Sequence, residues 1–138
     1  MASRRKSREL ALQMLFQWEM GQHPPEHVIA TFLKNQKLEP EVANFARTLF
    51  EGTVGEIKNL DRLVREQSEH WRPERMAAVD RNLLRVALYE LLHYPETPAA
   101  VVINEALEIA RRFSGENSVE FINGVLDGVR KTLAAPKS

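Results

Sequence analysis

Apolar residues recur three and four positions apart along this whole chain, and no segment alternates cleanly between apolar and polar residues. Spacing of three and four places side chains on one face of an α-helix, whereas a half-buried strand requires alternation. The sequence therefore predicts an all-α fold. Its 138 residues are enough for one domain, spanning 1–138, with a sizeable buried core.

Proline, glycine and capping residues divide this pattern into helices. We expect helices over residues 3–20, 26–35, 40–64 and 74–93, then one opened by Thr97-Pro98 and ending near Gly115, and a last one capped by Asn117 or Ser118. Gly52 and Gly55 lie inside the long third segment and predict the close approach of a neighbouring helix. Trp71-Arg72-Pro73 is the best candidate for a hinge between two halves.

Composition excludes several classes of protein. The chain has no cysteine, which rules out disulfides, thiolate zinc sites and thiol nucleophiles and fits a reducing cytoplasm. No apolar run approaches the length of a membrane span. Nineteen basic residues balance nineteen acidic ones. Any affinity for nucleic acid must therefore come from a local patch and should be modest and sensitive to salt.

Residues that could carry catalysis or bind a metal are not grouped. The sequence contains no Gly-rich phosphate loop and no nucleophile elbow. His23 and His27 are four residues apart, but Pro24-Pro25 between them prevents a helical metal pair, and no third ligand accompanies them. We therefore expect no enzymatic activity, no metal and no cofactor.

The first residues concentrate positive charge. Arg4, Arg5, Lys6 and Arg8 run directly into the apolar pattern of the first predicted helix. Arginine on a helical scaffold suits bidentate contact with phosphate, and a basic stripe on one element is typical of nucleic-acid binding. The alternative is a solvated chain terminus without a ligand.

Two apolar features lie off the expected core faces. Leu12, Phe16 and Met20 form a second stripe on the first helix, which is either covered by the second helix or offered to a partner. Phe121 lies at the edge of the core face of the last helix, beside a strip formed by Gly124 and Gly128. This arrangement suits the stacking of a base from single-stranded RNA, and it equally suits tight helix packing.

The helix over 74–93 is apolar nearly all round, as expected for the central helix of a bundle. Asp80, Arg81, Arg85 and Glu90 interrupt it. Because buried charges need partners, we expect Glu90 to form a structural ion pair. Arg81 and Arg85, one turn apart, either share an acidic partner or present a surface cation pair.

Four motifs carry a resemblance that covers essentially the whole chain. The chain resembles the NusB family of bacterial transcription antitermination factors in Arg8-Glu9 leading into Leu15-Phe16-Gln17-Trp18, in Leu84-Arg85-Val86-Ala87-Leu88-Tyr89-Glu90-Leu91, in Val102-Ile103-Asn104-Glu105-Ala106, and in Phe121-Ile122-Asn123-Gly124-Val125-Leu126-Asp127. The resemblance implies about seven helices in two packed three-helix subdomains. We place these subdomains at about residues 1–70 and 71–135.

The resemblance also implies a function, and with it partners. Members of this family bind the boxA element of ribosomal RNA operon transcripts as single-stranded RNA, together with a small-subunit ribosomal protein that acts as NusE, and help RNA polymerase read through terminators. By this resemblance, the RNA-binding residues are Arg4, Arg5, Lys6, Arg8, Asn117 and Phe121. Phe16 and Asp80 match positions toward NusE, and the second stripe adds Leu12 to the partner-binding residues.

Two other functions fit this all-helical chain less well. One is the helical RNA-binding module found at the N-terminus of some ribosomal RNA methyltransferases, which carry a long catalytic domain behind it. The other is a duplex-DNA-binding helix-turn-helix protein, but the chain lacks a recognisable short turn and recognition helix. Whether the free protein forms a homodimer stays open from the sequence.

Overall fold

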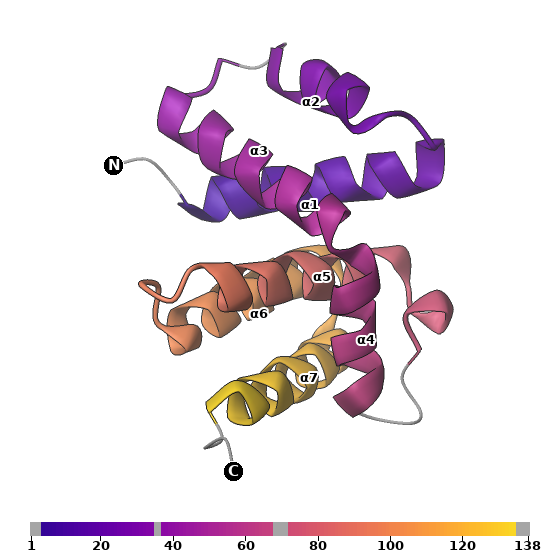
Figure 1. Ribbon diagram of the computed structural model, residues 1–138, viewed down its shortest axis with the longest axis vertical. Helices are drawn as coiled ribbons and strands as arrows, with labels where there is room; N and C mark the ends of the chain where they lie inside the picture. The colour runs from indigo at the N-terminus through magenta and orange to yellow at the C-terminus, as the bar shows by residue number, and fades with distance from the viewer. Residues whose placement is uncertain (1–3, 35–36, 68–71, 135–138) are drawn as a thin grey trace.

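The computed structural model describes residues 4–34, 37–67 and 72–134. Within these ranges it contains no strand, and the all-α prediction is confirmed. The elements are α1 (Arg4–Gly21), α2 (Pro25–Lys34), α3 (Pro40–Gly55), α4 (Ile57–Gln67), the short 3-10 helix η1 (Pro73–Arg75), α5 (Ala78–His93), α6 (Ala99–Phe113) and α7 (Glu116–Ala134) (Figure 1).

Several predicted helix boundaries were wrong. The segment expected as one helix from Pro40 breaks at Glu56, whose backbone leaves helical geometry at φ −122° and ψ 20°. The helix expected from residue 74 begins at Ala78, because Pro73–Arg75 forms a 3-10 turn instead.

The two predicted helix caps also differ from the structure. Pro98, not Thr97, is the N-cap of α6, and no side chain caps that helix. The last helix begins at Glu116, ahead of Asn117 and Ser118. The Ser118 hydroxyl does not cap it and instead bonds to the Asp80 carboxylate of α5.

The helices form two packed groups. α1, α2 and α3 pack on one another, and α4, α6 and α7 pack with α5. Figure 1 shows the first group above the second, with α1 and α3 lying against α5. α4, which follows Glu56, contacts α5 and α7 and so packs with the second group. Of the predicted hinge, Trp71 lies outside the described residues, and Arg72-Pro73 connects elements of the second group.

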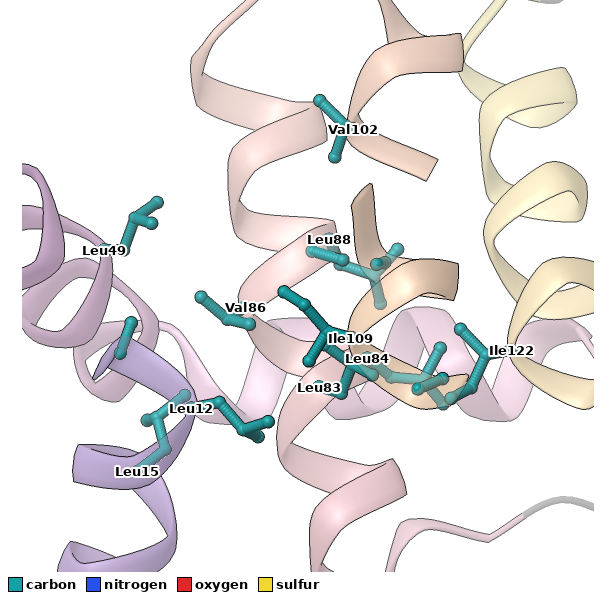
Figure 2. Close-up of a cluster of buried hydrophobic side chains, with 14 of the residues drawn as sticks. Leu12, Leu15, Leu49, Leu83, Leu84, Val86, Leu88, Val102, Ile109 and Ile122 are labelled. Carbon is teal, nitrogen blue, oxygen red and sulfur yellow. The ribbon is translucent and has the colours of Figure 1, made fainter. Parts of the chain in front are cut away.

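Helix α5 is the centre of the core, as its sequence predicted. Leu83, Leu84 and Leu88 are almost completely buried. Figure 2 shows these side chains meeting Ile109 of α6 and Ile122 of α7 on one side, while Leu12 and Leu15 of α1 approach from the other. Burial of each such side chain stabilises the fold by about 1.5–3 kcal/mol. One continuous core therefore joins the two groups.

Charged side chains are buried in the contact between α1 and α5. Glu19 of α1 accepts hydrogen bonds from both Arg81 and Arg85, so the prediction that these arginines share an acidic partner is confirmed. Arg85 also donates two bonds of 2.8 Å to the Asp61 carboxylate of α4. These ion pairs therefore connect α1, α4 and α5 at one place.

The pKa values in this network reflect two opposed effects. Burial raises the pKa of the Glu19 carboxyl, but hydrogen bonds and charges from Arg81 and Arg85 outweigh burial and hold the pKa below its ordinary value. Burial lowers the pKa of Arg85, and the bonds to Asp61 and Glu19 outweigh it and raise the pKa. Both groups are therefore charged at neutral pH.

A glycine allows α3 to approach α5 closely. A Cβ atom at Gly52 would lie 2.1 Å from the ring of Tyr89, so the predicted close approach is confirmed there. A Cβ at Gly55 meets no atom within 4 Å, and the same prediction was wrong for that glycine.

These two glycines give a matched test of packing. We expect Gly52→Ala to lower the free energy of unfolding by about 1–3 kcal/mol, because the Tyr89 ring must move. The control Gly55→Ala should be neutral or stabilising by up to about 1 kcal/mol, because alanine favours the helix and meets no neighbour. Urea unfolding of both variants measures the difference. Equal stability of the two would contradict the packing described for Gly52.

Candidate functional site

The first turns of α1 carry the basic cluster on a helix, as predicted. Arg4, Arg5 and Lys6 are exposed, and we call these three residues the α1 cationic surface. The Arg4 guanidinium lies 4.0 Å from the centre of the Phe45 ring of α3, a cation–π contact. Arg4 is thus held against α3 while remaining open to solvent.

Arg5 is paired across the surface with α6. Its Nε donates to Glu105 Oε2 at 3.0 Å, and the hydrogen bond and the charge of Glu105 raise the pKa of Arg5. The Arg5 side chain remains 50% exposed and that of Glu105 20% exposed. The pair therefore lies at the protein surface, where a ligand can reach it.

Arg8, which the resemblance assigns to RNA binding, lies almost fully buried in this structure. Its side chain is 7% exposed, and it forms a two-point ion pair with Glu90 of α5, with Nε at 2.8 Å from Oε1 and Nη2 at 2.6 Å from Oε2. The structural ion pair predicted for Glu90 is confirmed. The charge of Arg8 is used inside the protein, so Arg8 is a positioning residue that anchors α1 on α5.

Sequence reasoning missed one cation beside this surface. Arg112 of α6 donates to Glu9 of α1 at 2.8 Å, and its side chain is 67% exposed. Its seven-residue spacing from Glu105 puts both on one face of α6. This spacing points to Arg112 only once α6 is known to lie beside α1.

The predicted residues of α7 lie beyond the corner where α6 ends. Asn117 is exposed in the first turn of α7. Phe121 is partly buried and packs against the core, in keeping with a core-edge residue. The predicted glycine strip is interrupted, because the Gln67 side chain covers Gly128, whereas nothing lies within 4 Å of a Cβ at Gly124.

An apolar groove of about 350 Å³ opens beside the second stripe of α1. Phe16 is 40% exposed at this groove and Phe113 is 39% exposed, while Leu12 is buried. The stripe is therefore partly covered and partly open. The groove is lined by Leu12, Gln13, Phe16, Gln17, Phe32, Val79 and Phe113.

Asp80 follows Val79 of this groove in the sequence, but its carboxylate is not open to solvent. Its carboxylate accepts a hydrogen bond of 2.7 Å from the Ser114 hydroxyl and one of 2.8 Å from Ser118. The residue is 9% exposed. Asp80 thus fastens the start of α5 to the corner between α6 and α7, and it positions Val79 and Phe113 at the groove.

Among the residues that the structure describes, no three His, Asp or Glu side chains are grouped so that they could hold a metal ion. The rings of His23 and His27 lie 4.8 Å apart, on either side of the start of α2. Within the same residues, no helix is both long and apolar enough to cross a bilayer.

The fold and these surfaces define a class: a small all-helical binding protein, with a cationic surface at the start of α1 and an apolar groove beside the same helix. The model of the NusB family matches residues 5–131. The chain belongs to the NusB family.

Individual relatives align with this chain over nearly its full length. The transcription antitermination protein NusB of Koribacter versatilis is 56% identical over 136 residues, which cover 98% of this chain and 93% of the relative. The solved structure of T. maritima NusB is 34% identical, with a TM-score of 0.87, covering 95% of this chain and 93% of that one. A solved complex of the antitermination factors NusB and NusE with dsRNA shares the fold at 23% identity and a TM-score of 0.84, covering 94% and 96%.

The two α1 arginines provide a test of their different roles. We expect Arg8→Ala to lower the free energy of unfolding by about 3–5 kcal/mol, because it leaves the buried Glu90 carboxylate unpaired. Arg5→Ala should cost at most about 1 kcal/mol, because its ion pair is solvent-exposed. Chemical unfolding of the two variants measures both values. If Arg8→Ala costs no more than Arg5→Ala, the anchoring role of Arg8 is wrong.

Proposed function

We propose that this chain is a transcription antitermination factor. It binds boxA RNA of ribosomal RNA operon transcripts together with the small-subunit ribosomal protein NusE, and it supports read-through by RNA polymerase in the cytoplasm. The observation that carries this proposal is the kinship over nearly the whole chain with a protein named for transcription antitermination. The role is one of binding, without catalysis or a cofactor.

The α1 cationic surface supplies the phosphate contacts. Arg4 and Arg5 can each present two parallel N–H groups to a phosphate, and Lys6 adds a point charge. Asn117 and Phe121 of α7 add contacts to bases, with Phe121 stacking at the core edge. Because the chain has no net charge, this local surface provides the electrostatic attraction.

The apolar groove is the surface for NusE. Phe16 and Phe113 together expose aromatic area at its rim, and Leu12 forms part of its wall. Partly exposed aromatic side chains at a groove are typical anchors of protein interfaces. Asp80 contributes by holding the corner that shapes the groove.

The RNA proposal is tested with the variant Arg4→Ala/Arg5→Ala/Lys6→Ala. We expect affinity for single-stranded boxA RNA to fall about tenfold or more, and the salt slope to drop by about 0.7 for each phosphate that the variant no longer neutralises. Fluorescence anisotropy across a potassium chloride series measures both quantities. The control removes three exposed cations that are paired on their own helices, Arg47, Arg62 and Arg130.

Two results would contradict this proposal. One is an equal loss of affinity in the control variant, which would mean that overall charge and not the α1 surface governs binding. The other is a preference for duplex DNA of the same sequence over boxA RNA.

The partner surface is tested separately. We expect Phe16→Ala to weaken binding of purified NusE about tenfold or more, because it removes an exposed aromatic anchor from the groove. Val101→Ala is the control, since Val101 is 45% exposed on α6 and does not line the groove. Titration calorimetry gives both affinities. Wild-type affinity for Phe16→Ala would remove this groove from the interface.

A further inference from the structure

One carboxylate of α6 serves two arginines of α1. Glu105 Oε2 accepts from Arg5 Nε at 3.0 Å, while Glu105 Oε1 lies 3.5 Å from Nη1 of Arg8. The Arg5 side chain is half exposed, whereas the Arg8 side chain is almost fully buried. Glu105 therefore stands between one exposed cation and one buried cation.

The two arginines differ in how readily they can leave. Arg8 is held by both oxygens of Glu90, in a contact where both side chains are almost fully buried. Arg5 has Glu105 as its hydrogen-bond partner, and half of its side chain faces water. An exposed ion pair contributes little to stability because water screens it and the long side chains lose entropy. Arg5 can be displaced without disturbing the anchor of α1.

Phosphate and carboxylate compete for the same feature of arginine. Both accept two parallel N–H bonds from a guanidinium group. A phosphate approaching Arg5 must take the place of Glu105, and it also meets the negative charge of Glu105. Glu108, one turn further along α6, adds to this field at Arg5.

We propose that Glu105 is an internal competitor of RNA phosphate. It holds Arg5 in the free protein and releases it to a phosphate group in the complex, while Arg8 stays in place between Glu90 and Glu105. This inference rests on the proposed binding of RNA by the start of α1. In this role Glu105 sets the affinity of the protein for RNA and contacts no base.

The exchange has a consequence for salt dependence. When Arg5 moves to phosphate, Arg8, Glu90 and Glu105 remain with one excess negative charge. This charge attracts a cation and offsets the counterion released from RNA. Arg5 thus adds less than the usual ~0.7 to the salt slope in the wild type, and about 0.7 once the competing charge is removed.

The experiment uses Glu105→Gln, which removes the charge and keeps the shape of the side chain. We expect binding to tighten about two- to fivefold, by the same factor for boxA RNA and for a scrambled RNA of equal length. Arg5→Ala should lower the salt slope more in the Glu105→Gln background than in the wild type. Glu108→Gln is the matched control, because it removes the same charge one turn away, from a partner of Arg111. Its gain should be clearly smaller.

A second measurement follows Arg5 in the unmodified protein. The Nε–Hε NMR signal of Arg5 should change its shift on addition of RNA, and that of Arg8 should stay in place. Equal affinities of the two glutamine variants, a gain for only one RNA, or an Arg5 signal unchanged in the complex would overturn the inference. Failure of the wild type to bind any RNA would instead overturn the proposed function.

Discussion

The contact between α1 and α5 decides how the rest of the molecule is arranged. Arg8 near the start of α1 pairs with Glu90 near the end of α5, and Glu19 near the end of α1 pairs with Arg81 near the start of α5. The helices are therefore antiparallel and are fastened at both ends. Removing these charges from water is costly, so the pairs add little net stability compared with apolar packing. Their contribution is to fix the register and rotation of α1 on the central helix.

The rotation of α1 places the two proposed binding surfaces on one side of the protein. Arg5, Leu12 and Phe16 lie seven and four residues apart, so they form a single stripe along the helix. The stripe begins at the cationic surface and ends at the apolar groove. RNA and a protein partner bound to these surfaces would therefore lie side by side. Neither surface requires a movement of α1, because the ion pairs that set its rotation face α5.

Local pattern predicted the parts of this structure that depend on neighbours in sequence. The all-α class, the central position of α5 and the need of Glu90 for an ion pair follow from helical spacing and from the cost of burying charge. Pattern could not distinguish Arg5 from Arg8, because only the place of α5 and α6 decides which of them is buried. The Asp61 that pairs with Arg85 is likewise 24 residues away. The break at Glu56 was not predicted because no proline marks it.

If the chain binds RNA as we propose, internal pairing lets a neutral chain do so without binding every RNA strongly. The arginines of the first turns are already engaged, Arg4 with Phe45 and Arg5 with Glu105. A phosphate backbone alone must displace these contacts, so the electrostatic attraction that every RNA shares is reduced. Under the proposed function, stable binding then depends on contacts that phosphate cannot supply, namely the proposed contacts of bases with α7 and of the partner with the groove. With little electrostatic attraction common to every RNA, the proposed selection of an RNA depends on the combined surface of this chain and its partner.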